Sequence, residues 1–388
     1  MNVKNALVIK LSPLNGLNSS MLRTLALIKG LRENGFEIDF VTIKESATTT
    51  LNDLSKYAFL NDINVYYANA NLAYDRIVKQ ERKGKIKQLI VSLIRKLYHA
   101  VSIFDYTNKI SKTISIKELT GKNYEFIISV SDPKTSHKVV KTLKKQKVTG
   151  KKWIQYWGDP LALDITKPGF YPEWVYNKIE SGLLKGADKV IYTSPFTVEE
   201  QGNLFPRYKE KFYFVPTAYI KEKLFMDTDG TYTIGYYGAY KSKVRDIRPL
   251  YNACKNRNDL DLNIVGDTDI VLEEKDNIKI YTRREIEEFE NNTDLFVCIL
   301  NKSGTQIPGK LYHYAATNRP VLVIVDGDKQ DEMIQFLKNF NRYYICQNDE
   351  LSIGEAITRI KSESKAFAPL EELSSVNVAK KIIEISSR

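Results

Sequence analysis

The segment Thr305–Tyr314, which reads TQIPGKLYHY, carries the most specific chemical signal in the sequence. Pro308 fits the first turn of a helix, and the loop ahead of that turn would present free backbone N–H groups to an anion. Lys310 adds a positive charge at the same place. The segment predicts a binding site for a diphosphate group, and the alternative interpretation is an ordinary capped helix.

A glycine loop with three cations, at residues 238–245, is the second candidate for anion binding. Gly238 permits a ligand to approach the backbone closely. The side chains that could neutralise a diphosphate leaving group are Lys241, Lys243 and Arg245. A solvated charged loop is the alternative.

Another loop, Ser12–Asn18, contains Gly16 and stands ahead of a helical stretch. The start of a helix favours an anion such as a phosphate, because its N–H groups are free. The dinucleotide-binding spacing G-x-G-x-x-G is absent. A ligand-facing loop and a plain tight turn are equal alternatives for Gly16.

Candidates for acid–base chemistry follow two predicted strands. Asp132 and His137 come after Phe126–Val130, and Asp159 comes directly after the strand that ends at Trp157. Asp159 is placed to orient or deprotonate an acceptor hydroxyl, with His137 as a second candidate. Asp132 could instead cap a helix, and a lone histidine is more often structural than catalytic.

Three aromatic residues, Trp153, Tyr156 and Trp157, cluster on the strand before Asp159. Such rings suit either stacking on a sugar or ordinary packing. We expect Trp153 in the core, and Asp132 and Trp157 on the acceptor side of the site.

Alternating strands and helices would position these residues. Strand Ala6–Leu11, helix Ser19–Asn34 and strand Phe36–Ile43 form a β-α-β unit, in which Ser19 or Ser20 caps the helix and Gly35 ends it. Further strands are expected at 65–67, 126–130, 153–157 and 189–193. This order predicts a parallel sheet with helices on both faces.

A second α/β series begins near Tyr232, with strands expected at 234–237, 262–265, 278–281, 295–300, 320–325 and 343–346. A helix is expected at 309–317. The length of 388 residues also fits two domains. We expect a first domain at 1–216, a linker at 217–230, a second domain at 231–370, and a terminal helix at 371–388 that packs back on the first domain.

The composition indicates which kinds of partner and which cellular location to expect. The net charge of +11 suggests an anionic partner, such as nucleic acid, a membrane surface or a phosphorylated substrate. Three cysteines without C-x-x-C spacing are expected to be reduced core thiols. No run reaches the ~18 apolar residues of a membrane span, and the first apolar run is too short for a signal peptide, so we expect a cytoplasmic protein.

The segment 82–98 combines a basic cluster with apolar residues at helical spacing. Such a helix can lie on an anionic membrane, and the alternative is a helix packed on the first domain. Docking of this kind would suit a lipid-linked acceptor on the inner face of the cell membrane.

Taken together, the segments resemble the retaining GT-B glycosyltransferases of family four, especially those that assemble bacterial capsule, exopolysaccharide and lipopolysaccharide. The resemblance covers nearly the whole chain and is carried by the opening loop and helix, 187–191 with Thr193-Ser194, Val215-Pro216, 235–238, 264–266, 293–295, and 308–314 with Arg319-Pro320. It implies two Rossmann-like domains facing each other across a cleft. It also implies a nucleotide-sugar donor on the second domain, an acceptor on the first, and metal-independent transfer with retention.

Position by position, the resemblance places Gly238 and the cations after it at the diphosphate, and Thr282 and Arg283 near the base. Gln306, Ile307, Pro308, Gly309 and Lys310 fall against the phosphates and the donor sugar. Thr305 and His313 occupy the two positions of the family's Glu-x7-Glu signature, so both carboxylates are replaced. The family's arginine after Gly238 is Ala239 here.

The sequence therefore predicts a hexosyltransferase that moves a hexose or N-acetylhexosamine from a UDP-sugar to a glycan or lipid-linked glycan, in cell-surface polysaccharide assembly. No metal, cofactor or nucleic-acid partner is expected. Because both signature glutamates are replaced, the alternative is a non-catalytic GT-B scaffold that binds a glycan or a partner glycosyltransferase.

Overall fold

The computed structural model describes residues 4–16, 18–45, 52–68, 102–105, 107–165, 167–227, 230–282, 286–363 and 365–388. Arg283 and the basic segment 82–98 lie outside these ranges. The chain divides into two compact units: unit 1 comprises Met1–Ile220 with Ser375–Arg388, and unit 2 comprises Lys221–Ser374.

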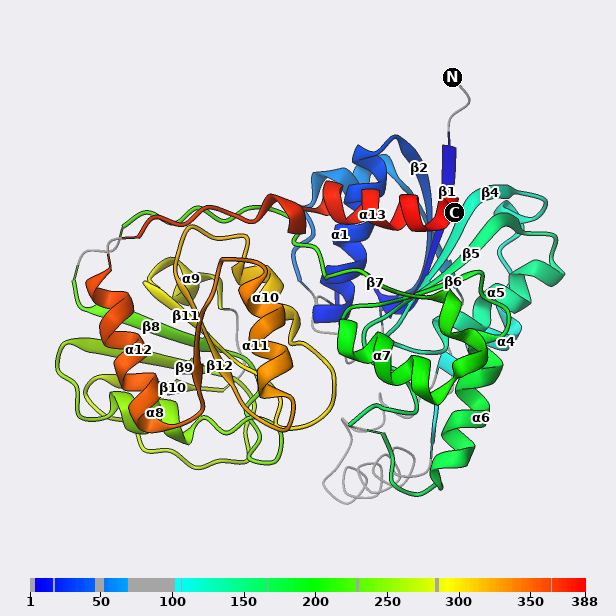
Figure 1. The fold of residues 1–388 in the computed structure, drawn as a ribbon. Coiled ribbons are helices and arrows are strands. Elements are labelled where there is room, and N and C mark those ends of the chain that lie inside the picture. The colour runs from blue at the N-terminus through cyan, green and yellow to red at the C-terminus, as the bar shows by residue number, and fades with distance from the viewer. Residues whose placement is uncertain are drawn as a thin grey trace, which may run out of the picture. The chain divides into compact units, whose positions relative to one another are not determined.

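Unit 1 is built on a seven-stranded sheet with the order β3-β2-β1-β4-β5-β6-β7 (Figure 1). Every pair of neighbouring strands is parallel, as the alternation of strands and helices predicts. The strands are β1 (Lys4–Pro13), β2 (Phe36–Ile43), β3 (Asn64–Ala68), β4 (Asn123–Val130), β5 (Thr149–Trp157), β6 (Lys189–Tyr192) and β7 (Phe212–Phe214).

Both faces of this sheet are buried, which explains the apolar run Ala6–Ile9 in β1. Because side chains alternate along a strand, Ala6 and Val8 pack into one core while Leu7 and Ile9 pack into the other. The first core is covered by α1 (Ser19–Glu33) and α13 (Ser375–Ser387), and the second by α4 (Thr107–Thr113), α5 (Ser136–Lys145) and α6 (Glu173–Leu184). Helix α7 (Pro195–Leu204) follows β6.

Helix α1 begins at Ser19, as predicted, but its cap differs from the prediction. The Asn18 side chain accepts a hydrogen bond from the Met21 backbone N–H at 2.9 Å, so Asn18 is the N-cap rather than Ser19 or Ser20. Gly35 follows the helix with φ of +84°, a conformation that glycine adopts without steric cost.

The C-terminal helix α13 packs against α1, as expected, and buries Val378, Ala379 and Ile382 completely or almost completely (Figure 1). The two helices are in close contact at Gly30. A Cβ atom on this residue would lie only 1.9 Å from the Ser375 carbonyl oxygen and 2.7 Å from the Ala379 Cβ. The docking of α13 therefore depends on the absence of a side chain at position 30.

Unit 2 contains a six-stranded parallel sheet with the order β10-β9-β8-β11-β12-β13. Its strands are β8 (Tyr232–Tyr237), β9 (Leu260–Val265), β10 (Ile278–Tyr281), β11 (Leu295–Ile299), β12 (Val321–Val325) and β13 (Tyr344–Gln347). Its helices are α8 (Arg248–Cys254), α9 (Glu287–Asn291), α10 (Gly309–Tyr314), α11 (Gln330–Lys338) and α12 (Glu350–Ser362). Apolar residues of α8 and α12 share one core with the sheet.

No helix within the described ranges is long and apolar enough to cross a bilayer.

We expect Gly30→Ala to destabilise unit 1 by about 1–3 kcal/mol, because the new methyl group overpacks the α1–α13 contact. The matched control is Gly182→Ala in α6, where a Cβ atom meets nothing within 4 Å. That change should raise stability by about 0.5–1 kcal/mol through helix propensity. Urea denaturation followed by circular dichroism measures both, and equal stabilisation by the two changes would contradict the close helix contact.

Candidate functional site

The strand order of unit 2 reverses between β8 and β11, and ligands of such sheets bind at the carboxyl ends of the strands beside the reversal. The two loops that leave these strands are joined by hydrogen bonds. The Lys302 N–H donates to the Val244 carbonyl oxygen at 2.8 Å, and Arg245 Nε donates to Asn301 Oδ1 at 2.9 Å. The structure thus brings together the two segments that the sequence singled out for a diphosphate.

Gly238 lies at the centre of this arrangement. Its N–H donates to the Val265 carbonyl oxygen at 2.8 Å. A Cβ atom on Gly238 would lie 3.9 Å from Lys310 Cδ, so the Lys310 side chain reaches the glycine loop. On the other side, a Cβ atom on Gly266 would lie 1.9 Å from the Gly238 carbonyl oxygen, so Gly266 must be a glycine for this loop to pack.

The three predicted cations of the glycine loop differ in their surroundings. Arg245 is half-buried, and its Nη1 donates to the Ala239 carbonyl oxygen at 3.2 Å, which holds the guanidinium against the loop. Lys241 and Lys243 are exposed. Hydrogen bonding therefore holds the Arg245 side chain in place on the loop, whereas the side chains of Lys241 and Lys243 are exposed to solvent.

Helix α10 carries Lys310 and His313 on one side, since they are three residues apart. The helix has six residues, fewer than the expected 309–317, and Pro308 is its N-cap residue. Lys310 Nζ lies 5.8 Å from the ring centroids of both Tyr237 and Tyr314.

His313 is neutral in this setting. Burial, together with Lys310 and Lys223, lowers the pKa of its imidazole to about 4. Its Nε2 is buried, and no described residue offers it a hydrogen-bond partner. At the other signature position, Thr305 is buried. Neither residue provides the negative charge of a glutamate.

The remaining donor-side candidates lie on the same edge of the sheet. The Gln306 carbonyl oxygen accepts a hydrogen bond from Asn301 Nδ2 at 3.5 Å, and Ile307 is buried. Thr282 is exposed directly after β10, and β9 separates that strand from β8.

In unit 1 the strand order reverses between β1 and β4, and two buried basic side chains, Lys10 and Arg23, lie there. Lys10 is fully buried and donates to Ser20 Oγ at 2.8 Å and to the Asp132 carbonyl oxygen at 2.5 Å. Arg23 Nη2 donates to the Ser131 carbonyl oxygen at 2.6 Å. These side chains fix the loop that carries Asp132; neither was singled out from the sequence, because each was hidden in an apolar segment.

Three carboxylates surround Lys134 in the same region. Its Nζ lies 3.0 Å from Asp132 Oδ1 and 2.8 Å from Asp164 Oδ2. Burial and the charge of Asp132 raise the pKa of Asp159 to about 6, although Lys134 opposes this. The cluster thus contains a carboxyl group that changes charge near neutral pH, as an acid–base residue requires.

The structure places His137 and Trp157 differently from expectation, because both are fully buried. The two rings stack with centroids 4.2 Å apart, and His137 Nδ1 is hydrogen-bonded to Ser129 Oγ at 2.8 Å. Burial holds the pKa of His137 well below its usual value. Trp157 has no face open to a sugar, and His137 has no contact with solvent, since α5 and α6 cover this side of the sheet.

Gly16 lies in a tight turn, as one of its two interpretations expected. Its N–H donates to the Pro13 carbonyl oxygen at 3.1 Å. The turn stands between β1 and α1, at the same edge as Asp132.

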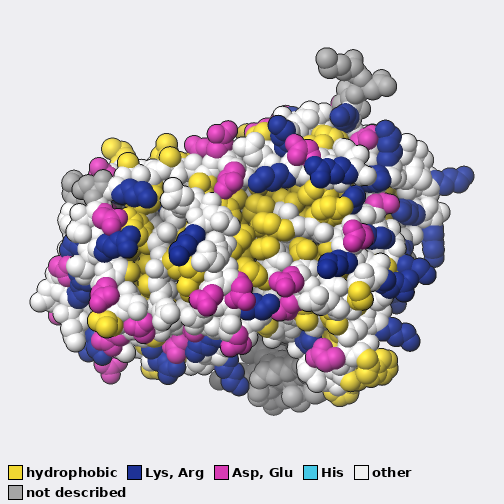
Figure 2. Space-filling model, viewed as in Figure 1, with side chains coloured by type: hydrophobic (Ala, Val, Ile, Leu, Met, Phe, Trp, Pro, Cys, Tyr) yellow, Lys and Arg dark blue, Asp and Glu magenta, His cyan; other side chains and the backbone are white. Residues whose placement is uncertain are grey.

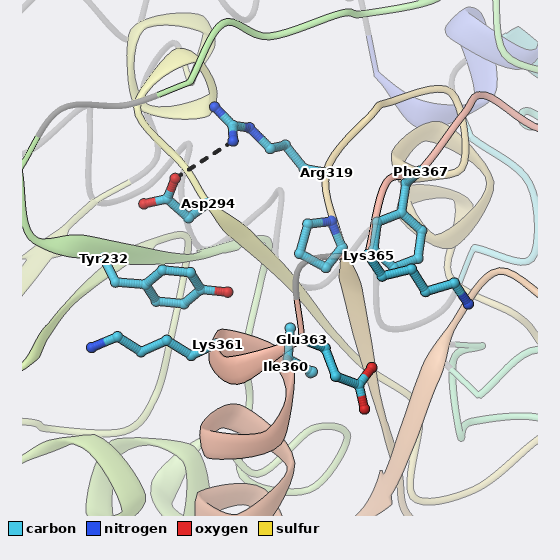
Figure 3. A pocket seen from close by; sticks show the side chains of 9 residues that line it. Tyr232, Asp294, Arg319, Ile360, Lys361, Glu363, Lys365 and Phe367 are labelled. Carbon is cyan, nitrogen blue, oxygen red and sulfur yellow. Dashed lines mark ion pairs between the residues drawn. The ribbon is translucent and has the colours of Figure 1, made fainter.

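A small pocket lies at the opposite edge of the unit 2 sheet, where β8, β11 and β12 begin (Figure 3). Arg319 and Asp294 face each other across it at 3.6 Å, with Tyr232 and Phe367 at its sides. Ligands of parallel sheets bind at the carboxyl ends, and charged groups of this pocket have ion-pair partners: Arg319 pairs with Asp294, whereas Lys361 and Glu363 pair with residues outside the pocket. The candidate site is therefore the Gly238–Lys310 edge.

Among the described residues, no group of three or more His, Cys, Asp or Glu is arranged to hold a metal ion.

Solved structures share this fold over nearly the whole chain. HepE from Anabaena in complex with UDP superposes with a TM-score of 0.57 at 10% identity, covering 99% of this chain and 99% of that chain. A glycosyltransferase from Rickettsia africae gives 0.56 at 13% identity, covering 100% and 98%. Sucrose-phosphate synthase from Thermosynechococcus elongatus gives 0.52 at 14%, covering 99% and 94%.

No known protein-family profile matches the sequence, and no curated protein matches it either. At such low identities the structural likeness shows the fold alone, which is the GT-B fold with two parallel α/β units.

The raised pKa of Asp159 predicts that the difference in stability between the wild type and an Asp159→Asn variant depends on pH. Between about pH 4 and pH 6 the folded chain keeps a proton on Asp159 that the unfolded chain releases, so rising pH removes stability from the wild type. The Asp159→Asn variant has no titrating group at this position. As the pH rises from about 4 to about 6, its free energy of unfolding should therefore increase by about 2 kcal/mol relative to that of the wild type.

Urea denaturation at pH 4, 5, 6 and 7 measures this difference. A difference in unfolding free energy that stays constant with pH would contradict a raised pKa at Asp159.

Proposed function

We propose that the chain is a glycosyltransferase that moves a hexose or N-acetylhexosamine from a UDP-sugar to a glycan or lipid-linked glycan. The observation that carries this proposal is the convergence of Gly238, Arg245 and Lys310 at the strand reversal of unit 2. The GT-B fold, which this chain shares with the UDP-bound HepE, supports it. Transfer would retain the anomeric configuration, need no metal, and serve cell-surface polysaccharide assembly at the cytoplasmic face of the membrane.

In this proposal the donor lies on unit 2. Gly238 lets the diphosphate approach the backbone, while Arg245 and Lys310 stabilise the charge that develops on it as the bond to the sugar breaks. The exposed Lys241 and Lys243 add to the attraction. Further donor contacts are proposed for Thr282, Arg283, Thr305, Gln306, Ile307, Pro308, Gly309 and His313, and for Gly16 of unit 1.

The acceptor side is proposed to lie on unit 1, around Asp132 and Asp159. A hydroxyl oxygen of the acceptor forms the new bond to the anomeric carbon, and its proton passes to the Asp159 carboxylate. The nucleoside diphosphate leaves with the electrons of the broken bond. His137 and Trp157 act through the packing beneath this loop, because both rings are buried.

A non-catalytic scaffold is the second candidate. It is favoured by a specific observation: the neutral His313 and the buried Thr305 stand where the related enzymes carry two glutamates. A scaffold of this kind would bind a glycan or a partner transferase without turnover.

Calorimetric titration with UDP tests the donor seat. We expect the wild type to bind UDP and Lys310→Met to bind it about 10- to 100-fold more weakly, because a hydrogen bond to a charged group contributes about 1.5–3 kcal/mol. The matched control is Lys338→Met, which removes the same charge from the exposed surface of α11 and should bind like the wild type.

UDP release from UDP-sugars in the presence of a lipid-linked glycan distinguishes the two candidates. Binding of UDP without release across the common donors would favour the scaffold. Absence of UDP binding in the wild type would contradict the proposed donor-binding site on unit 2 itself.

A further inference from the structure

Two neighbouring helices of unit 1 carry six lysines and no acidic residue. These residues, which we call the lysine face, are Lys109 and Lys112 on α4, and Lys138, Lys141, Lys144 and Lys145 on α5. All are exposed except Lys138, which is half-buried. Since the whole chain has 58 basic and 47 acidic residues, a pair of helices with lysines alone is a strong local imbalance.

The lysines of the two helices lie close together. Lys138 Nζ bridges the helices, because it donates to Asn108 Oδ1 at 2.6 Å and lies 4.0 Å from the Phe104 ring centroid. Burial, together with the positive charges of Lys112 and Lys141, lowers the pKa of Lys138. On α5 the apolar Val139, Val140 and Leu143 point into the core, which leaves the lysines on the outer side.

The positive surface continues onto α6. Lys141 Nζ donates to the Gly182 carbonyl oxygen at 2.8 Å, which ties α5 to α6. The exposed Lys178 on α6 and the exposed Lys185 directly after it add two lysines. Figure 2 shows Lys and Arg side chains gathered at this side of unit 1.

The start of α6 adds two large exposed aromatic residues. Phe170 is 66% exposed and Trp174 is 65% exposed. Aromatic rings of this kind are typical of the boundary between water and lipid, where one side is apolar and the other wet.

We propose that the lysine face docks unit 1 on an anionic lipid surface, and that Phe170 and Trp174, at the start of α6, insert into the same surface. Lysine ammonium groups are mobile point charges that match a fluid layer of phosphate headgroups, and each strengthens binding to such a layer by about fivefold. The proposal does not depend on the donor seat, because it concerns a different surface of a different unit.

Single-stranded nucleic acid fits this surface less well. Its binding sites interleave cations with aromatic rings that are open for base stacking. Here the rings beneath the lysines are covered: Lys138 lies over Phe104, and Lys144 lies 5.3 Å from the ring centroid of the buried Trp153. The exposed Phe170 and Trp174 do not alternate with these lysines, because they lie at the start of α6 whereas Lys141 contacts its end at Gly182.

Co-sedimentation of the full chain with vesicles tests the proposal. We expect binding to vesicles of phosphatidylglycerol and phosphatidylcholine in equal parts, weakening as salt rises, and little binding to phosphatidylcholine alone. Replacing Lys112, Lys144 and Lys145 by Gln should weaken binding about 100-fold, at about fivefold for each lysine. The matched control replaces the exposed Lys221, Lys279 and Lys338 of unit 2 by Gln and should change binding less than fivefold.

Tryptophan fluorescence gives a second readout. Trp153 and Trp157 are buried, so a blue shift on adding the anionic vesicles would come from Trp174 and should vanish in Trp174→Ala. Thermal unfolding would show that the variants are folded.

Two outcomes would overturn the proposal. Equal loss of vesicle binding in the two triple variants would mean that net charge, and not this face, drives binding. Equally tight binding of single-stranded DNA at the same salt concentration, lost in the same variant, would assign the face to nucleic acid.

Discussion

Both sheets reverse their strand order once, between β1 and β4 in unit 1 and between β8 and β11 in unit 2. Because every strand pair is parallel, all the loops that follow the strands leave from one edge of each sheet. The candidate site residues lie on loops or helices of that edge: Asp132 and Asp159 in unit 1, and Gly238 and Lys310 in unit 2. Within each unit, the proximity of these residues therefore depends on the strand order, and a different order would separate them.

Charge is used differently at the two reversals. In unit 1, Lys10 and Arg23 are buried and donate to the main-chain carbonyl groups of the loop at Ser131 and Asp132, so their hydrogen bonds stabilise the backbone conformation of this loop. In unit 2, Arg245 and Lys310 stay partly accessible beside a glycine. A cation that remains accessible next to open backbone suits an anionic ligand, whereas a buried basic side chain that donates to carbonyl groups is structural.

Much of the fold follows from local patterns. Strands β2 and β10 begin and end at the residues that the sequence predicts, Phe36–Ile43 and Ile278–Tyr281. Element ends set by a single side chain are less predictable: Asn18 caps α1 in place of a serine, and α10 ends three residues early. The close contacts at Gly30 and Gly266 have no local signal at all, because the atoms that require glycine come from distant segments.

The sequence by itself determined two parallel α/β units, a terminal helix returning to the first unit, and the two segments that supply cations to the unit 2 edge. These depend on the period and length of apolar runs and on where glycine and proline stand. Only the tertiary structure decided that Asp132 and Asp164 share Lys134, and that His137 and Trp157 are buried. Burial and charge pairing depend on which helices cover a residue, and that is fixed by packing between segments far apart in the chain.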